Sequence, residues 1–156
     1  MGKEKITFAQ YNNSYNAELN TWQAKENAQG RNGLDEFVVS KGTLLGDYLE
    51  FITDEMKDIA CDVALLDGDL AGFVCYTSPA EGHVHIEIMG VNPDMRGKGL
   101  AKSMLKSFKE EMSICAGIDK VTLEANKNNE AAINSFSKIA TKSESQPKEN
   151  YISFEL

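Results

Sequence analysis

Apolar and polar residues follow one another along the chain in two periods, and the order of these periods predicts an α/β fold (α+β). Short runs with a period of two, rich in β-branched and aromatic residues, predict strands. Longer runs with apolar residues three and four positions apart predict helices. Strands are expected at residues 5–10, 59–66, 70–78, 83–91, 119–126 and 151–156. Helices are expected at residues 13–28, in one or two pieces within 34–56, from 101 onward, and at 128–140.

The middle of the chain predicts an antiparallel meander of three strands. Asp67, Gly68 and Asp69 separate the first two, a sequence typical of tight hairpins, and residues 79–82 supply the next turn. The helix after this meander is the clearest in the chain, and Gly117 ends it. Its apolar stripe consists of Ala101, Met104, Leu105, Phe108, Met112 and Cys115, while Lys102, Lys106 and Lys109 point elsewhere.

Length, composition and charge bound the possible classes of protein. With 156 residues, 42% of them hydrophobic, the chain is expected to form one domain over residues 1–156. The formal net charge of −8 argues against nucleic acid or an anionic membrane as partner. A cationic substrate would suit this charge, although solubility alone explains it equally well. No apolar run approaches the ~18 residues of a membrane span, and the first residues contain no apolar signal core, so we expect a cytoplasmic protein.

The cysteines fit a reducing compartment. Cys61, Cys75 and Cys115 are odd in number and form no C-x-x-C pair, so they are interpreted as reduced core thiols. Cys61 and Cys75 can also face each other across the predicted hairpin. None of the three belongs to a recognisable cysteine and histidine pair, so none is interpreted as a nucleophile.

A glycine-containing loop joins the fourth predicted strand to the clearest helix. It contains Arg96, Gly97, Lys98 and Gly99, where glycine allows tight turning and the helix start offers unpaired amides to an anion. A Walker loop is excluded because Asn92 stands where that motif requires a first glycine. The dinucleotide fingerprint fails as well, because its third glycine is replaced by a lysine.

The remaining pattern is Arg96-x-x-Gly99-x-Ala101, preceded by Val91-x-Pro93. It resembles the acyl-CoA pyrophosphate loop of the GCN5-related N-acetyltransferase (GNAT) superfamily. The resemblance implies a mixed, mostly antiparallel central sheet, splayed between the fourth and fifth strands and flanked by helices. It also implies acetyl-CoA (CoA) as cofactor. The residues expected to bind it along the strand and loop are Met89, Gly90, Val91, Arg96, Gly97, Lys98, Gly99, Leu100 and Ala101.

A second segment, residues 129–138, resembles the superfamily's helix after the splayed strands. The resemblance implies that Asn129 hydrogen-bonds the cofactor near its pantetheine, although asparagine is also a common helix cap. Phe136 stands where the superfamily commonly has a tyrosine that protonates the thiolate of CoA, and phenylalanine cannot donate a proton. Water, Ser135 or Tyr76 would then serve, or acid catalysis is dispensable because the thiolate is already a tolerable leaving group.

The candidate catalytic base lies on the fourth predicted strand. His85 and Glu87 are two positions apart, so their side chains leave one face, opposite the face expected to carry Ile86 and Ile88. Their positions resemble those where superfamily members carry a catalytic glutamate or histidine, although a solvent-facing pair is the simpler interpretation. Either side chain could take a proton from an amine. No metal site is expected, because His83 and His85 lack a third ligand of suitable spacing.

These observations predict an acetyl-CoA-dependent N-acetyltransferase that moves an acetyl group to a primary amine by direct attack in a ternary complex. The acceptor, a small-molecule or peptide amine, is expected between residues 15–49, the face of His85 and Glu87, and the C-terminal loop. A catalytically silent acyl-CoA-binding or protein-interaction module on the same scaffold is the alternative, which Phe136 favours. Whether the chain forms a homodimer stays open.

Overall fold

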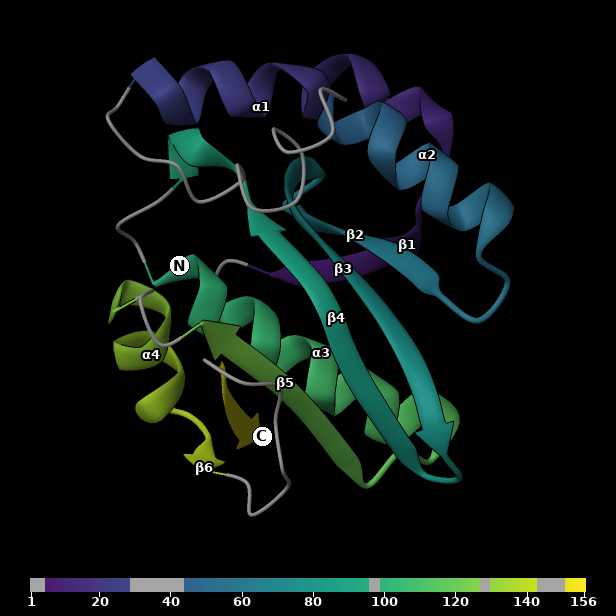
Figure 1. Cartoon of the computed structure of the whole chain (residues 1–156), viewed down its shortest axis with the longest axis vertical. Helices are drawn as coiled ribbons and strands as arrows, with labels where there is room; N and C mark the ends of the chain where they lie inside the picture. Colours follow the sequence, from purple (N-terminus) through teal and green to yellow (C-terminus); the bar gives the residue numbers. More distant parts are fainter. Residues whose placement is uncertain (1–4, 29–43, 96–98, 127–129, 143–150) are drawn as a thin grey trace.

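Seven strands form one sheet in the computed structural model, with helices on both of its faces (Figure 1). The structure describes residues 5–28, 44–95, 99–126, 130–142 and 151–156. The strands are β1 (Ile6–Gln10), β2 (Ala60–Leu66), β3 (Asp69–Ala80), β4 (His83–Val91), β5 (Lys120–Asn126), β6 (Thr141–Lys142) and β7 (Tyr151–Glu155). Their order across the sheet is β1-β2-β3-β4-β5-β7-β6.

The direction of the strands follows from the lengths of the connections between them. Short turns join β2 to β3 and β3 to β4, and these pairs are antiparallel, as are β1 with β2, β5 with β7, and β6 with β7. Strands β4 and β5 pair in parallel. A parallel pair needs a long crossover, which here contains a helix. The prediction of a mixed, mostly antiparallel sheet flanked by helices is confirmed.

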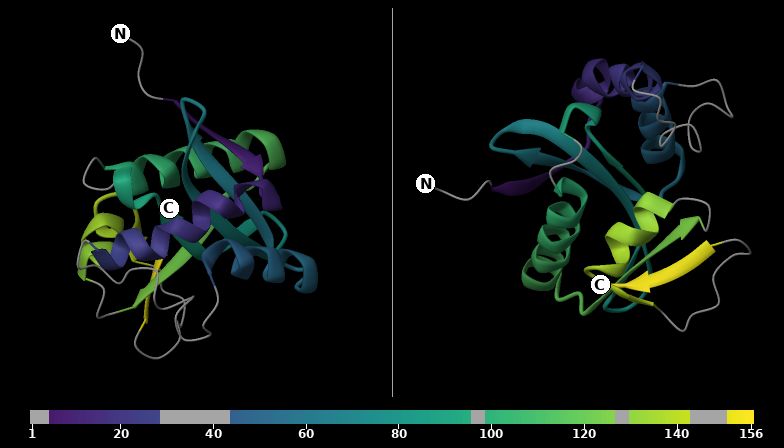
Figure 2. Two further views of the ribbon diagram at one scale, coloured as in Figure 1. Left: turned by 90° about the horizontal axis from the view of Figure 1, so that it is seen from above. Right: turned by 90° about the vertical axis from the view of Figure 1, so that its left-hand side faces the viewer.

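The helices cover the two faces of the sheet in pairs, as the views in Figure 2 show. They are α1 (Asn16–Ala28) and α2 (Leu45–Glu55) on one face, and α3 (Leu100–Ala116) and α4 (Glu130–Ser137) on the other. Two short 3-10 helices, η1 (Asn13–Tyr15) and η3 (Pro93–Met95), precede α1 and α3. Across the described parts of the chain, no helix combines the length and apolar character needed to cross a membrane.

Each pair of helices closes its own hydrophobic core against the sheet. Under α1 and α2, Leu19, Trp22 and Leu49 are fully buried and pack with Phe73 of β3. Under α3 and α4, Met104, Leu105 and Phe108 are fully buried and pack with Phe154 of β7. The apolar stripe predicted for α3 is therefore correct at these three positions.

An extra residue in β4 changes which face its side chains occupy. Tyr76 of β3 pairs with Ile86, whereas the preceding Cys75 pairs with Ile88, so Glu87 is the inserted residue of a β-bulge. Ile86 consequently packs in the core under α3, and Ile88 packs in the core under α1 and α2. The expectation that Ile86 and Ile88 share a face is wrong, because the bulge shifts the alternation by one position.

Two further expectations are corrected at the ends of elements. Strand β3 reaches Ala80, past the predicted end at residue 78, and the turn is confined to residues 81 and 82. The ladder accommodates Pro79 because its register shifts between Thr77 and Ala80, where a residue without an N–H is tolerated. The short strand β6 had no recognisable signal in the sequence.

The cysteines divide into a buried pair and an exposed thiol. Cys61 and Cys75 face each other across β2 and β3, both are buried and free, and their Sγ atoms are 3.0 Å apart. This hydrogen bond, followed by burial, raises the pKa of the Cys75 thiol. The expectation of a core thiol is wrong for Cys115, which is exposed because the last turn of α3 extends beyond the hydrophobic core.

Candidate functional site

The start of α3 leaves peptide N–H groups without an acceptor in the helix. Gly99 is the N-cap residue, in the left-handed conformation (φ 70, ψ 22), and it provides no side-chain cap. The first intrahelical bond runs from the Ser103 N–H to the Gly99 carbonyl, at 3.1 Å. The amides of the residues just before Ser103 therefore have no helical acceptor. Apart from the two chain neighbours of Gly99, no heavy atom of the described residues lies within 4 Å of the position that its Cβ would occupy, so the space there is open.

Asn92 holds the segment that leads into this helix, a role that the sequence analysis missed. It is 4% exposed, its N–H donates to the Ala71 carbonyl at 2.7 Å, and its amide Nδ2 donates to the Leu70 carbonyl at 3.0 Å. Its Oδ1 accepts the N–H of Asp94 at 2.9 Å and so begins η3. Asn92 thus fixes the direction in which the chain leaves β4. The Asn-Pro pair was the available signal, since such pairs favour turns.

Strands β4 and β5 separate halfway along their length. Their register pairs run from His83 with Lys120 to Ile86 with Leu123, and none follows, although β4 continues to Val91. Figure 1 shows the C-terminal ends of the two strands diverging toward the start of α3. We call this region the β4–β5 opening. Its start coincides with the bulge at Glu87, which bends β4 away from its neighbour.

The main chain of β4 presents two residues to this opening. Asn92 donates its N–H to β3, and backbone groups alternate along a strand, so Gly90 also faces β3. The N–H and carbonyl groups of Met89 and Val91 consequently face the opposite edge, which β5 has left. Of the three β4 residues predicted to bind cofactor, Met89 and Val91 therefore border the β4–β5 opening with their main chain, whereas Gly90 does not.

Gly90 has a packing role instead. A Cβ at this position would lie 2.2 Å from Cε1 and 2.6 Å from Cζ of the fully buried Phe73 ring. We therefore expect Gly90→Ala to lower the free energy of unfolding by about 1–3 kcal/mol, a typical cost of overpacking. Urea unfolding followed by circular dichroism measures this change. Adding Phe73→Leu should recover part of this lost stability, because it removes the ring that the new Cβ meets. If the double variant loses as much stability as the sum of the two single variants, the packing role is contradicted.

Two histidines of β4 share one buried hydroxyl of β5. The Nε2 atom of His83 and the Nδ1 atom of His85 each lie 2.7 Å from Oγ1 of Thr122, whose side chain is 3% exposed. His83 and His85 are partly exposed. The pKa of His83 is lowered, first by loss of solvation, then by Lys120 and by His85, while Glu155 opposes the shift. Thr122 was not identified from the sequence, because its partners are brought to it only by strand pairing.

Glu87 lies on the same sheet face as these histidines, as the sequence predicts. It is exposed, and its Oε1 accepts a hydrogen bond of 2.9 Å from the Thr77 hydroxyl of β3. Thr77 is in turn the register partner of His85. The structure thus gathers His85, Glu87, Thr77 and Thr122 across three strands, next to the β4–β5 opening. This arrangement provides one carboxylate and one imidazole as possible proton acceptors.

Tyr76, the hydroxyl candidate whose side chain the structure describes, is not brought to this group. Tyr76 precedes Thr77 and points to the other face, where its hydroxyl donates to Asp62 at 3.0 Å and its ring contacts Phe108. Burial and the Asp62 carboxylate raise the pKa of Tyr76. Phe136 is buried and contacts the Phe154 ring at a centroid distance of 5.7 Å. The side chain of Ser135 lies outside the described residues.

Four of the predicted cofactor residues also lie outside the described part of the chain: Arg96, Gly97, Lys98 and Asn129. The described flank before the loop contacts α1, since Lys25 of α1 forms an ion pair of 2.7 Å with Asp94 of η3. Within the described ranges, no three His, Cys, Asp or Glu side chains are arranged to hold a metal ion.

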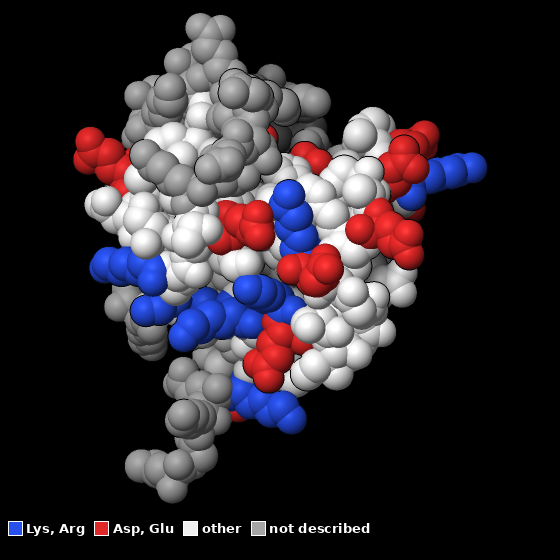
Figure 3. Space-filling view, turned by 90° about the horizontal axis from the view of Figure 1, so that it is seen from below, with Lys and Arg blue, Asp and Glu red and all other residues white. Residues whose placement is uncertain are grey.

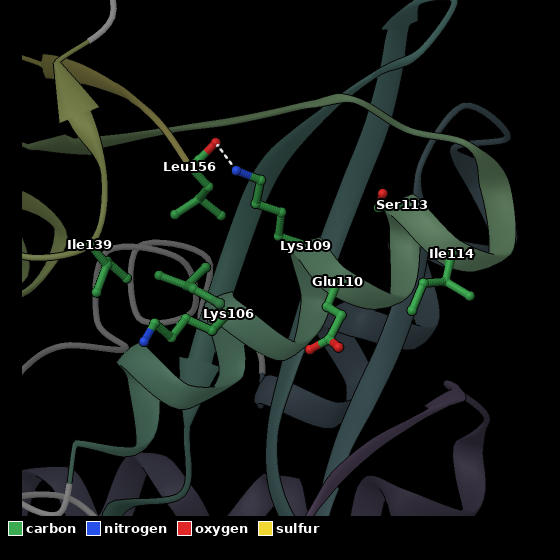
Figure 4. A pocket seen from close by; sticks show the side chains of 8 residues that line it. Lys106, Lys109, Glu110, Ser113, Ile114, Ile139 and Leu156 are labelled. Carbon is green, nitrogen blue, oxygen red and sulfur yellow. Dashed lines mark hydrogen bonds between the residues drawn. The ribbon is translucent and has the colours of Figure 1, made fainter.

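A hollow of about 570 Å³ lies on the other side of the sheet from His85 and Glu87. Figure 4 shows Lys106, Lys109 and Ile114 of α3 along it, with Lys109 donating to the Leu156 carbonyl at 2.7 Å. None of the predicted site residues that the structure describes lines it. In Figure 3, basic side chains gather in a band on one face of the molecule. The negative net charge of −8 is therefore not spread evenly over the surface.

The sheet opens between two parallel strands, beside a helix start without a side-chain cap, as the resemblance to the GNAT superfamily implies. The model of the Acetyltransferase (GNAT) family matches residues 16–140, and the chain belongs to this family. Family membership makes it an acyltransferase with acetyl-CoA as cosubstrate. Comparison with curated protein sequences gives no match.

Solved structures share the fold at low sequence identity. The spermidine N-acetyltransferase of Vibrio cholerae, in complex with CoA and spermine, is 12% identical with a TM-score of 0.69, over 96% of this chain and 92% of that one. The Campylobacter jejuni N-acetyltransferase PseH, in complex with acetyl coenzyme A, is 9% identical with a TM-score of 0.67, over 97% and 98%. The ribosomal-protein-S5-alanine acetyltransferase of Vibrio fischeri is 12% identical with a TM-score of 0.65, over 100% and 94%.

Proposed function

We infer that this protein transfers the acetyl group of acetyl-CoA to a primary amine, which attacks the thioester directly in a ternary complex. The observation that carries this inference is the β4–β5 opening. It lies beside the free amides of α3 and is bordered by the main chain of Met89 and Val91. A peptide-like pantetheine arm suits this strand edge, since an extended chain can add to unpaired backbone groups.

The pyrophosphate is proposed to bind the amides from Arg96 through Gly97, Lys98, Gly99 and Leu100 to Ala101. The left-handed Gly99 and the open space around it support this placement. Several charge-assisted hydrogen bonds, each worth about 1.5–3 kcal/mol, would together hold the nucleotide. Asn129 is proposed to contact the pantetheine from the start of α4.

Glu87 and His85 are the proposed proton acceptors. An amine is mostly protonated near neutral pH, so a base must take a proton before or during attack on the thioester carbonyl. The amide of Met89, which faces the opening, is proposed to polarise that carbonyl. Most of the rate gain would come from holding amine and thioester together, which can supply several kcal/mol.

The acceptor is proposed to be a small cationic amine or a protein amine. The overall charge of −8 and the exposed Glu87 carboxylate favour a cation. The structural neighbours include one solved with spermine and one named for an alanine of a ribosomal protein. We place the acceptor on the α1 and α2 side of the sheet, near His85 and Glu87. A cytoplasmic location is proposed as well, in keeping with the reduced Cys61 and Cys75.

A panel of primary amines tests this proposal. The protein is incubated with acetyl-CoA and a polyamine, an amino sugar or a peptide with a free N-terminus, and thiol release and product mass are measured. We expect release of CoA together with acetylation of at least one amine. Binding of acetyl-CoA without turnover on any amine would contradict the proposal and support the silent module, which the buried Phe136 favours by lacking a hydroxyl.

A further inference from the structure

We propose that Thr122 and His83 form a proton relay that connects His85 to solvent and serves both halves of acetyl transfer. The inference rests on the proposed function, because it requires His85 to exchange a proton with the reacting amine. The observation behind it is that two imidazoles each lie 2.7 Å from Oγ1 of Thr122. Neither the family nor the sequence pattern assigns these two contacts.

Because a hydroxyl has a single proton, the two hydrogen bonds of Thr122 must run in the same direction, one accepted by its oxygen and one donated by it. A threonine hydroxyl has one proton to donate and can accept others. With both rings neutral, one ring must receive the Thr122 proton on a bare nitrogen while the other donates an N–H to Oγ1. We assign the donor to Nδ1 of His85, which leaves its Nε2 bare for the substrate side. His83 then carries its proton on Nδ1 and accepts the Thr122 proton on Nε2.

In the first half of the reaction, one proton enters the relay from the amine and one leaves it to solvent. The N–H bond of the amine breaks, and its proton bonds to Nε2 of His85. The Nδ1 proton of His85 passes to Oγ1 of Thr122, and the original Thr122 proton passes to Nε2 of His83. His83 releases its Nδ1 proton to solvent. Both rings remain neutral at the end, with the hydrogen bonds of the relay reversed.

In the second half, the relay runs backward and restores the starting state. Nε2 of His85 gives its proton to the sulfur of the departing CoA, and the Thr122 proton returns to Nδ1 of His85. The Nε2 proton of His83 returns to Oγ1, and His83 takes a proton from solvent on Nδ1. This route supplies an acid to the thiolate without a hydroxyl at Phe136.

The surroundings of the three groups suit this role. Thr122 is 3% exposed, so water competes little for its hydroxyl, whereas His83 is partly exposed and can exchange with solvent. The charged groups that act on His83 are Lys120, His85 and Glu155, and the lowered pKa of His83 keeps a bare ring nitrogen available. Thr77 and Glu87 lie beside His85 on the same sheet face.

The matched variants Thr122→Val and Thr122→Ser test the relay in the full-length protein. Valine keeps the shape of threonine without the hydroxyl, and serine keeps the hydroxyl. The chain contains two histidines, so ¹⁵N NMR of the imidazoles reports on His83 and His85 alone. We expect both rings as Nδ1-protonated tautomers in the wild type and in Thr122→Ser, because the hydroxyl proton occupies Nε2 of His83 and Nδ1 of His85 donates to the oxygen. In Thr122→Val, at least one of the two rings should lose this tautomer preference. Identical tautomer populations in all three proteins would overturn the relay.

Activity provides a second readout with the amine found in the panel. Thr122→Val should lower kcat/KM at least about tenfold and alter its pH profile, and Thr122→Ser should restore both. His83→Ala should also lower the rate of acetyl transfer. Added imidazole should then raise the rate of this variant with increasing concentration, because it replaces the lost ring. Unchanged kcat/KM in Thr122→Val would refute the relay. A wild type that acetylates no amine would refute the proposed function, and the NMR tautomer populations would still decide whether Thr122 links the two rings.

Discussion

Replacing Gly99 with valine should weaken CoA binding at least about 100-fold, measured by isothermal titration calorimetry. Gly99 has φ 70 and ψ 22, a conformation that a β-branched residue adopts only with strain. The added side chain would also enter the open space in front of the α3 amides. Losing two charge-assisted hydrogen bonds of about 1.5–3 kcal/mol each corresponds to two or more orders of magnitude in Kd.

The other end of the same helix supplies a matched control for Gly99→Val. Gly117 has nearly the same conformation, φ 65 and ψ 26, and the same open space around its Cβ position. Gly117→Val should therefore cost similar stability and leave CoA affinity unchanged. Equal affinities for CoA in the wild type and in Gly99→Val would refute the placement of the pyrophosphate at the start of α3.

Replacing Glu87 with glutamine should lower kcat/KM about 100-fold or more and change the shape of its pH profile. The amide keeps the size of the side chain and its contact with Thr77, but it cannot take a proton from the amine. The affinity for CoA should stay close to that of the wild type, because Glu87 is not placed among the cofactor contacts. Steady-state kinetics over a range of pH, together with calorimetry, separates these two effects.

Two further variants serve as controls for Glu87→Gln. Glu110→Gln removes one exposed carboxylate from α3, on the other side of the sheet, and should leave the kinetics unchanged. His85→Gln should also lower kcat/KM, since both side chains are proposed as proton acceptors. A loss confined to His85→Gln would assign the base to His85 alone and contradict a catalytic role of Glu87.

The fold was largely predictable because its main signals are local. Apolar periods located α1, α3 and the meander, and the left-handed Gly117 ends α3 where the sequence predicts. The bulge at Glu87 was not predictable, since it depends on how β4 pairs with β3 and not on the residues of β4 themselves. It moves Ile88 to the opposite core and makes the simple alternation fail after residue 86.

The candidate site was predictable where it depends on one segment. His85 precedes the bulge and Glu87 is its inserted residue, so the alternation of side chains still holds between them and they share a face. Gly99 is the N-cap residue of the helix that the loop motif requires. Contacts between distant segments were not predictable. Asn92 binds backbone of β3, and Thr122 reaches two histidines of the neighbouring strand, although neither residue stands out in the sequence. Phe136, noted as a missing tyrosine, packs on Phe154 in the core.

A crystal structure of the protein with bound acetyl-CoA tests the central claim most directly. The account predicts the pyrophosphate against the amides of Gly99, Leu100 and Ala101, with the pantetheine between β4 and β5. It further predicts that the pantetheine hydrogen-bonds to the main chain of Met89 and Val91, and that the thioester points toward His85 and Glu87. A cofactor bound elsewhere, with the start of α3 empty, would contradict the account.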